Sequence, residues 1–532
     1  MKKDLLVILL LILLSTLASK SLFIPGAFTS HDLTHHVVRQ ISMDKILSEG
    51  QFPPRWSGDL NNGYGYPVFL FNYPLPAMLG EVFHKAGLGF VDSVKAVLFT
   101  SIILSVVGMY LFLKSLLGNK LSAFLGSIFY LYAPIRFLNI YVSAAVGASL
   151  ALGILPFVFL SIVEIKKGKK WAPYLGSLSL SLLILSHNVT AFIFMPVILI
   201  FAWPFKKQMI TMFLFGIGLS AWFWLPAILE KQYIQFDQIY NGFYKNQFIS
   251  IQQLLHSPWG YGLSHPQNPE LGDMSYQLGL VQILVMIILI PFIWVFKKVK
   301  EVRKIGIFVL AGFFLSVFLM LKISMSFWDN LSFLSIIQFP LRLSAIAIFC
   351  VSIASGLLVK YLPYKKILTI GLVILVIYAN RNHWHTNEVF NPGEDYYLNL
   401  KTTTTTYYED LPKWGKIMDK PSVGKFEMVG GIGGIKELKD KSVQVIAQVE
   451  ASKSGEMRFN QVYFPGWEIK VDGERVGFEY LSSGFPTFYL ESGKHLVEAS
   501  FKNTPDRNIA DLASAISVII WGILVCKLLL KS

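Results

Sequence analysis

Long apolar segments separated by short polar loops make up most of the chain. A helix needs about 20 apolar residues to cross the hydrocarbon core of a bilayer. The repeated pattern therefore predicts a polytopic α-helical membrane protein with about twelve transmembrane helices, four of which are short and have approximate limits. The predicted spans are residues 4–24, 95–114, 121–133, 143–163, 173–186, 189–204, 209–229, 277–296, 304–321, 342–360, 366–380 and 511–529.

The loops between these spans indicate the orientation of the chain. If the N-terminus is cytoplasmic, every short basic loop falls on the cytoplasmic side, as the positive-inside rule requires. We therefore predict a multi-pass protein of the cell membrane with both termini in the cytoplasm, whose chemistry takes place at the outer surface. The long loops that then lie outside are residues 25–94, 230–276, 322–341 and 381–510.

The last external segment changes to the alternation that is typical of β-strands. Apolar and polar positions alternate from residue 440 to 504, and VDGERV predicts a hairpin with its turn at Asp472-Gly473. We expect a small extracytoplasmic β-sandwich with Trp467 in its core. The predicted organisation is a transmembrane domain (1–380) with a long first external loop, a β-rich domain (381–510), and a final helix with a cytoplasmic tail (511–532).

The composition agrees with this interpretation. Of the 532 residues, 54% are hydrophobic and only 15% are charged, against about 25% charged in soluble domains. The net charge of +14 would suit a nucleic-acid ligand, but the basic residues concentrate in short loops, so membrane lipids are the expected partner and nucleic acid is not. Cys350 and Cys526 both fall in apolar segments and give neither a disulfide framework nor the spacing of a zinc site.

Directly after the first span stands the polar segment FTSHDLTHHVVRQ, residues 28–40. If a helix begins near Thr29 or Ser30, its spacing puts Asp32, His35, His36 and Arg39 on one face.

That face allows two kinds of chemistry. Asp32 is the expected catalytic residue, as a general base that deprotonates an acceptor hydroxyl. Asp32 with His35 and His36 is also a possible ligand set for a divalent metal such as Mg²⁺ or Mn²⁺. The alternative is an interfacial helix whose polar face merely meets water.

Aromatic and polar residues also gather in other external segments. Residues 53–76 mix Arg55 with Trp, Tyr, Asn and Gly, which suits either a sugar or an interfacial aromatic belt. HSPWGYG brings Trp259 and Tyr261 to the same surface.

Two further stretches have the residues of a binding site. SHN places His187 and Asn188 at a tight outer turn between two spans. QFPLRL places Arg342 at the outer start of a helix, where a cation and free backbone N–H groups favour an anion such as phosphate. The alternative for Arg342 is an interfacial arginine that extends toward water.

Taken in order along the chain, these motifs resemble those of a known group of proteins. An acidic residue after the first span, a long first external loop, many spans and an external β-domain resemble the GT-C superfamily of membrane glycosyltransferases. SHNVTAF, SPWGYG, DMSYQLGL, QFPLRL and TTTTTYYEDLPKW resemble the prokaryotic "6-pyruvoyl-tetrahydropterin synthase-related" membrane proteins. The segment VYFPGWEIKVDGERV with ESGKHLVEASF resembles the YfhO-like membrane proteins.

The resemblance implies transfer of a sugar from a polyprenyl-phosphate-linked donor to a glycan, lipid or protein acceptor outside the cytoplasm. It assigns Asp32 as catalytic base or metal partner and Arg342 as the contact of the donor phosphate, with His187 and Asn188 as weaker contacts. One segment departs from the pattern: where the family often has YVRGALGE, this chain has YVSAAVGAS, with Ser143 and Ala148 in place of charged residues.

Two other functions remain open at the level of sequence. A lipid or polysaccharide transporter or flippase would suit twelve spans, but no two-half repeat is present and charge within the spans is sparse. A non-catalytic carbohydrate-binding or assembly protein of the cell envelope would explain the missing charges near Ser143 and Ala148.

Overall fold

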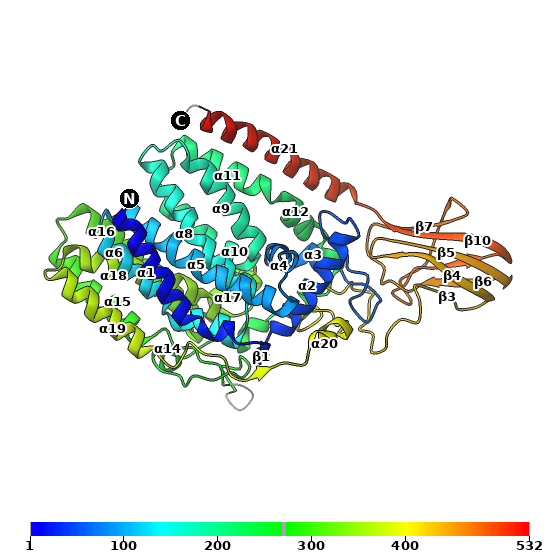
Figure 1. Ribbon diagram of the computed structural model, residues 1–532, viewed down its shortest axis with the longest axis horizontal. Coiled ribbons are helices and arrows are strands. Elements are labelled where there is room, and N and C mark those ends of the chain that lie inside the picture. The colour runs from blue at the N-terminus through cyan, green and yellow to red at the C-terminus, as the bar shows by residue number, and fades with distance from the viewer. Residues whose placement is uncertain (1, 269–272, 531–532) are drawn as a thin grey trace.

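The computed structural model describes residues 2–268 and 273–530 and consists of a helical bundle with β-sheets at one end (Figure 1). Each predicted span coincides with one helix, or with two consecutive helices at 209–229. These helices are α1 (Lys2–Ala18), α5 (Phe90–Leu117), α6 (Lys120–Leu131), α8 (Val146–Lys166), α9 (Ala172–Ser186), α10 (Asn188–Ala202), α11 (Lys207–Leu219), α12 (Ala221–Leu229), α15 (Leu280–Val295), α16 (Lys300–Met320), α18 (Ser344–Tyr361), α19 (Lys365–Ala379) and α21 (Pro505–Leu529).

Several of these helices have the length and hydropathy to cross a membrane. Five qualify in the described part of the chain, and two bent pairs raise the number to seven if each pair is one span. The bends are 52° after α6 and 68° after α11. The fold is therefore helical with several apolar helices, and the count of twelve spans stays a prediction. The five are Phe90–Leu117, Val146–Lys166, Lys300–Met320, Pro340–Tyr361 and Pro505–Leu529.

The turn between α5 and α6 shows how the sequence ends one helix and begins the next. Gly118 has a φ of +67°, a left-handed conformation that glycine adopts without steric cost, and its N–H donates to the carbonyl of Lys114. Asn119 then caps α6, because its side chain accepts a hydrogen bond from the N–H of Ser122 at 3.0 Å.

The loops that were predicted to be cytoplasmic contact one another. Asp4, in α1, forms ion pairs with Lys114 (2.9 Å) and Lys120 (3.0 Å). Lys167 donates a hydrogen bond to the carbonyl of Ser115 at 2.7 Å. These loops therefore share one face of the bundle, as the predicted alternation of spans requires. That this face is the cytoplasmic one stays a prediction.

The segments predicted to lie outside contain several short helices joined by loops. In Figure 1, α2, α3 and α4 occupy the region between the bundle and the sheets. The two-stranded ladder of β1 (Ala27–Phe28) with β2 (Val389–Phe390) joins the end of the first span to the segment after α19. The short helices are α2 (Leu33–Ser48), α3 (Val68–Phe71), α4 (Leu75–Lys85), α7 (Pro134–Phe137), α13 (Phe236–Tyr240), α14 (Ile251–Leu255), α17 (Met325–Asn330) and α20 (Glu394–Asn399).

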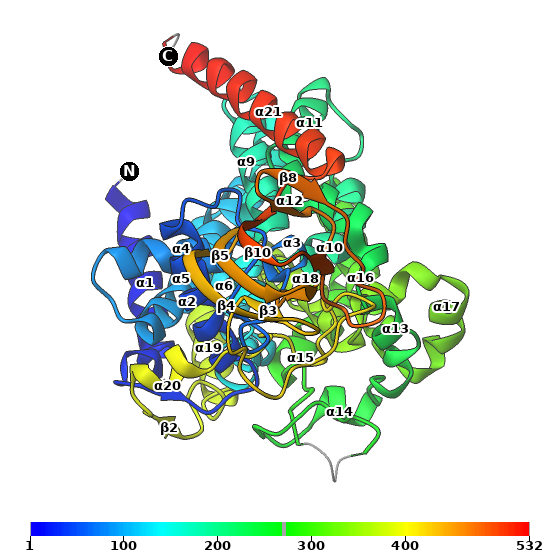
Figure 2. The ribbon, with the colours of Figure 1, turned by 90° about the vertical axis from the view of Figure 1, so that its right-hand side faces the viewer.

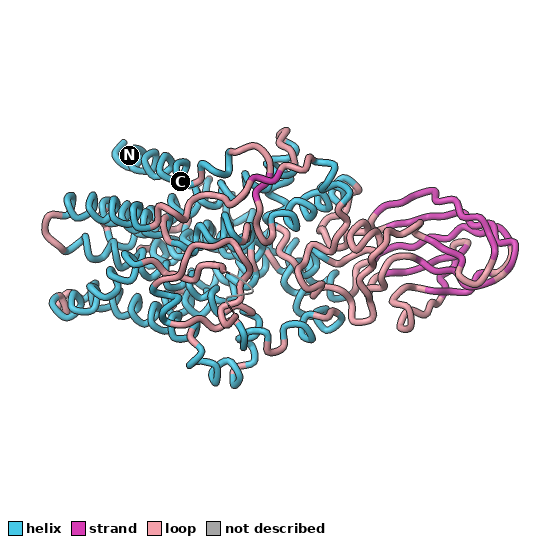
Figure 3. The backbone as a smooth tube through the Cα atoms, turned by 90° about the horizontal axis from the view of Figure 1, so that it is seen from below, coloured by secondary structure: helices cyan, strands magenta, loops and turns pink. Residues whose placement is uncertain are grey.

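Two antiparallel sheets form the end of the molecule away from the helical bundle (Figures 2 and 3). One has the order β4-β5-β10-β7-β8 and the other the order β3-β6-β9. Both contribute to one hydrophobic cluster, so the predicted sandwich-like packing is present. The strands are β3 (Phe426–Met428), β4 (Ile432–Lys441), β5 (Gln444–Lys453), β6 (Gly455–Phe459), β7 (Trp467–Val471), β8 (Glu474–Val476), β9 (Thr487–Leu490) and β10 (Gly493–Phe501).

Two details of the sheets match the sequence analysis. Trp467 is buried in the shared core against Trp56 and Phe459. The β7–β8 hairpin turns at Asp472 and Gly473, both with positive φ, as two-residue hairpin loops require. The limits of the domains stay a prediction.

A buried ion pair fastens the last helix to the rest of the molecule. Arg507 of α21 bonds Glu230 at 2.9 Å, and both side chains are almost fully buried. We expect Glu230→Met to lower the free energy of unfolding by about 3 to 5 kcal/mol, because it leaves the Arg507 charge uncompensated.

Thermal unfolding in nanodiscs would measure this effect. The matched control is Glu468→Met, which removes an exposed ion pair with Arg475 and should cost less than about 1 kcal/mol. Equal losses in the two variants would contradict the assignment of Glu230 as the main anchor of α21.

Candidate functional site

The start of α2 is held in place by the backbone of a neighbouring segment. The N–H groups of His31 and Asp32 donate to the carbonyls of Val142 and Ser143, both at 3.0 Å. Asp32 is the N-cap residue, two or three positions beyond the predicted helix start, yet its side chain makes no capping hydrogen bond. The carboxylate is therefore available to another partner, while its backbone is fixed.

A cavity of about 410 Å³ opens beside this helix start. Its walls come from α2, from the N-terminal ends of α8, α10 and α18, from residues 236–243, and from residues 404–410. The predicted polar face of α2 lines this partly open chamber: His36 and Arg39 are buried, and Asp32 and His35 are half-buried. The ionisable residues of the chamber are His31, Asp32, His35, His36, Arg39, His187, Tyr73, Tyr240, His265, Arg342, Tyr407, Glu409 and Asp410.

Two arginines supply the positive charge of the chamber. Arg39 is buried, donates to the carbonyl of Thr404 at 2.6 Å, and has an Nε without a partner. Arg342 donates from Nη1 to Gln338 Oε1 (2.6 Å) and to the carbonyl of Ile337 (3.0 Å). Within residues 2–268 and 273–530, neither arginine forms an ion pair.

Two carboxylates enter the chamber from residues 404–410. Glu409 accepts hydrogen bonds from the Tyr240 hydroxyl at 3.1 Å and from the Tyr407 N–H at 3.2 Å. Asp410 is buried and accepts a hydrogen bond from Asn72 at 2.7 Å. Burial, with the nearby charge of Glu409, raises the pKa of Asp410 well above that of an ordinary aspartate.

Opposing effects act on the pKa of Asp32. Burial raises its pKa, and the charge of Glu409 acts in the same direction. Nearby positive charges of Arg39 and Arg342 lower the pKa, but the net direction is upward. Asp32 thus binds a proton more readily than an exposed aspartate does, which suits a group that must accept one.

Burial favours the neutral form of three histidines of the chamber. Burial lowers the pKa of His35 to about 4 and lowers the pKa of His36 well below its usual range. Burial also holds down the pKa of His187, whose Nδ1 accepts the N–H of Thr190 at 3.1 Å. Its proton therefore lies on Nε2, which is a hydrogen-bond donor. Arg39 and Arg342 are the arginines that bring positive charge to the chamber.

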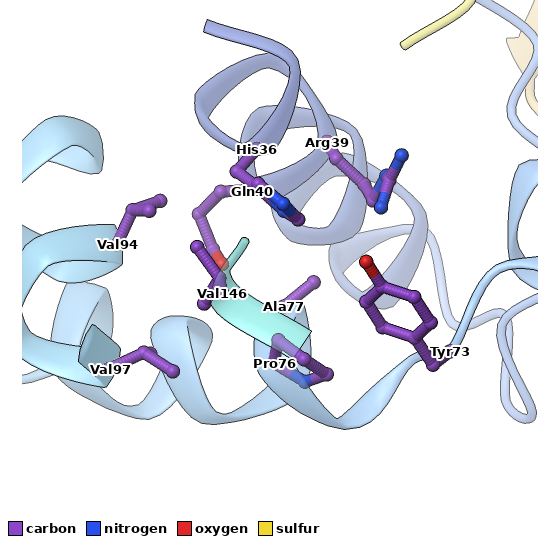
Figure 4. Close-up of a pocket in the computed structure, with 9 residues that line it drawn as sticks. All are labelled: His36, Arg39, Gln40, Tyr73, Pro76, Ala77, Val94, Val97 and Val146. Atoms are coloured by element: carbon purple, nitrogen blue, oxygen red, sulfur yellow. The ribbon is translucent and has the colours of Figure 1, made fainter. Parts of the chain in front are cut away.

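A smaller cavity lies behind Arg39 (Figure 4). Its volume of about 10 Å³ suffices for one water molecule, and His36, Arg39, Gln40 and Tyr73 offer it polar partners. The hydroxyl of Tyr73 points toward the side chains of α2 in this view.

The three predicted metal ligands all lie in the chamber. In the described part of the chain, no three His, Cys, Asp or Glu side chains are grouped to hold a metal. The triad of Asp32, His35 and His36 is thus not assembled as a ligand set, although all three line the chamber. The helical spacing brings the residues to one face but does not make their ligand atoms converge.

Strained backbone surrounds the charged groups. Ala144, Gln338, Thr404 and Tyr408 have φ between +48° and +63°, which costs energy in residues other than glycine. Each lies beside a contact of a charged residue: Thr404 presents its carbonyl to Arg39, and Gln338 presents its side chain to Arg342. Such strain is typical of functional sites, where the surrounding structure holds an unfavourable conformation.

Of the remaining predicted site residues, some line the chamber and others do not. His187 and Asn188 line the chamber, as Arg342 does. Arg55 instead bonds Asp511 of α21 at 2.5 Å, a contact that anchors the helix. The rest of the 53–76 segment is divided: Trp56 packs into the core of the sheets, whereas Phe71, Asn72 and Tyr73 line the chamber.

Trp259 and Tyr261 lie next to the chamber and contact a different set of residues. Trp259 stacks on His383 with ring centroids 4.4 Å apart, and the Tyr261 hydroxyl bonds His385. The carbonyl of Gly262 accepts a hydrogen bond from His31 at 2.9 Å, which links this loop to the start of α2.

The segment that departs from the family pattern also borders the chamber. Ser143 and Ala148 are lining residues, so this wall is uncharged. The carboxylates of Glu409 and Asp410 were not singled out as site residues from the sequence. The sequence signal for these two carboxylates is the polar run TTTTTYYED, which is part of the family resemblance described above.

No family model matches the chain, and no curated protein matches it. Several solved structures are similar to it. ArnT from Cupriavidus metallidurans bound to undecaprenyl phosphate has a TM-score of 0.40 at 13% identity, over 70% of this chain and 63% of its own. The arabinofuranosyltransferase AftD from Mycobacteria has a TM-score of 0.40 at 14% identity, over 71% of this chain and 26% of its own.

A third similar structure is the Archaeoglobus fulgidus oligosaccharyltransferase AglB, in complex with an inhibitory peptide and a dolichol-phosphate. Its TM-score is 0.35 at 12% identity, over 79% of this chain and 61% of its own. The chain thus spans less than two thirds of each of these proteins. At such TM-scores the likeness decides neither family nor activity, and the functional argument rests on the chamber.

Proposed function

We propose that this chain is a membrane glycosyltransferase of the GT-C type. It would move a sugar from a polyprenyl-phosphate-linked donor to an acceptor at the outer face of the cell membrane. The observation that carries the proposal is the chamber, which brings Asp32 together with Arg39 and Arg342, two arginines that have no ion pair among the described residues.

The arginines would hold the phosphate of the donor. Neither guanidinium group forms a direct ion pair among the described residues, so both remain available to bind an anion. Phosphate accepts bidentate hydrogen bonds from arginine, and Arg342 has only its Nη1 engaged by Gln338 and Ile337. His187 would add a neutral donor through Nε2.

Asp32 would be the base. The acceptor hydroxyl oxygen forms a bond to the anomeric carbon while the bond from that carbon to the phosphate oxygen breaks. The electron pair of the broken bond stays on the phosphate, where Arg39 and Arg342 stabilise it, and the hydroxyl proton passes to Asp32. Because no ligand set is assembled in the described residues, no step is assigned to a divalent metal.

The test is consumption of polyprenyl-phosphate sugars by the purified protein in nanodiscs, with Mg²⁺, with Mn²⁺ and with a chelator. We expect donor to be consumed and polyprenyl phosphate to be released. If a broad panel of donors is left intact under every condition, the proposal is wrong, and a binding or transport function gains support.

The pH dependence of transfer follows from the state of Asp32. A base must be unprotonated, and burial raises the pKa of Asp32. Activity should therefore fall with decreasing pH at values above about 4, where an ordinary aspartate is still ionised. Initial rates from pH 4 to 8 would show this acid limb. A rate that stays constant down to pH 4 would contradict the role of Asp32 as base.

A further inference from the structure

Five aromatic rings form a continuous wall on one side of the chamber. Tyr240 packs against Phe236 and Phe243, with ring centroids 4.8 and 5.3 Å apart. Phe243 contacts Phe339 at 5.3 Å and Tyr407 at 5.6 Å. All five line the cavity, and we call them the aromatic wall.

The wall extends from the interior to the mouth of the chamber. The ring of Tyr240 is buried, whereas 43% of the surface of Tyr407 is exposed. Phe236, Phe243 and Phe339 are half-buried between them. A molecule that enters at Tyr407 would therefore pass over exposed ring faces before it reaches the charged interior.

Glu409 belongs to the same wall. Tyr240 donates to its Oε1, and the N–H of Tyr407 donates to its Oε2. Each oxygen therefore has one donor and further capacity to accept. Glu409 forms no ion pair in the part of the chain that the structure describes. It is near enough to Asp32 to raise the pKa of that residue.

We propose that the aromatic wall with Glu409 is the acceptor subsite and that the acceptor is a carbohydrate. This inference rests on the proposed function and specifies its acceptor. The apolar C–H face of a sugar ring would pack on Phe243 and Tyr407, and its hydroxyls would donate to the free lone pairs of Glu409. The hydroxyl that reacts would then lie on the side of Asp32.

The other acceptor classes fit this wall less well. A lipid chain laid against the rings would cover the Glu409 carboxylate with hydrocarbon and leave its remaining lone pairs unsatisfied. A peptide has no flat apolar face flanked by several hydroxyls, which is the arrangement that rings beside a carboxylate match. We therefore expect sugars to bind where neither undecaprenol nor a serine-rich peptide does.

Saturation-transfer difference NMR tests this directly. The full-length protein in nanodiscs is irradiated at its aromatic protons in the presence of cellobiose, maltose, mannobiose, chitobiose or a serine-rich hexapeptide. We expect enhancement of the ring C–H protons of at least one disaccharide. Phe243→Ala should weaken its binding by about tenfold or more, because the stacking surface is lost.

The matched control is Tyr489→Ala, which removes an exposed tyrosine of the sheets outside the chamber and should leave binding unchanged. Binding of no disaccharide, or equal binding by the native protein and Phe243→Ala, would overturn the proposal. Enhancement of the peptide protons alone would also overturn the proposal and would favour a protein acceptor.

Kinetics separate the role of Glu409 from that of Asp32. With a disaccharide that binds, Glu409→Gln should raise the acceptor KM by roughly 10- to 100-fold with little change in kcat. Glu474→Gln, an exposed change in the sheets, is its control. A fall in kcat without a change in KM would overturn the assignment of Glu409 to the subsite.

The two proposals can fail independently. Donor hydrolysis without acceptor reports on the proposed function, and the control variant Tyr489→Ala should leave that hydrolysis intact. Disaccharide binding without any donor consumption would leave the aromatic wall as a carbohydrate-binding site and refute the transferase. Donor consumption without disaccharide binding would refute the carbohydrate subsite and support the proposed transferase.

Discussion

Asp32→Asn is expected to lower the rate of sugar transfer by about 10³-fold, because it removes the base that receives the acceptor proton. Asparagine keeps the size of the side chain, and the backbone of residue 32 is held by Ser143 whatever its side chain is. The donor should therefore still bind. The measurements are kcat with a saturating donor and the inhibition constant of undecaprenyl phosphate.

Asp395→Asn is the control for this substitution. It makes the same chemical change in α20, at an exposed position outside the chamber, and should leave kcat unchanged. Two results would contradict the prediction: native rates in Asp32→Asn, or a loss of rate that comes with loss of undecaprenyl phosphate binding. The second result would indicate that Asp32 holds the shape of the chamber and not the proton.

The part of the site that lies on α2 could be predicted because it depends on local spacing. Positions i, i+3, i+4 and i+7 share a face in any α-helix, and Asp32, His35, His36 and Arg39 do line one chamber. What surrounds that face could not be read from the same spacing. The sequence left open whether the face meets bulk water or a cavity, and the structure places it in the wall of a partly open chamber.

The opposite wall could not be predicted, because it depends on contacts between residues far apart in the chain. Arg39 bonds Thr404 across 365 positions, and the loop that carries Glu409 has no period that marks a buried face. Its strained residues, Thr404 and Tyr408, adopt a left-handed backbone that no sequence rule expects of threonine or tyrosine.

Arg55 shows the converse error. An arginine among aromatic and amide side chains is typical of a sugar site, and the sequence contains nothing that distinguishes such a site from a domain contact. The structure places its guanidinium on Asp511, 456 positions away, where it fixes the start of α21. Composition indicated the residue types correctly, but only the fold determines the partner.

Arg342→Gln should lower transfer by about 10²-fold or more, through loss of a positive charge that stabilises the leaving phosphate. Arg39 remains as the second cation, so binding of the phosphate should weaken without being abolished. Arg342→Lys should restore only part of the rate, because a lysine cannot bond Gln338 and a phosphate with the fixed geometry of a guanidinium. The measurements are kcat, the donor KM and the inhibition constant of undecaprenyl phosphate for both variants.

The inhibition constant carries the decisive part of this experiment, since it reports phosphate binding without any chemistry. It should rise in Arg342→Gln and stay native in Arg458→Gln, a control that removes an arginine from an ion pair with Glu427 in the sheets. If undecaprenyl phosphate binds Arg342→Gln as it binds the native protein, Arg342 does not contact the phosphate. Its hydrogen bonds to Gln338 and Ile337 would then be its whole contribution, as a support for the strained turn at residue 338.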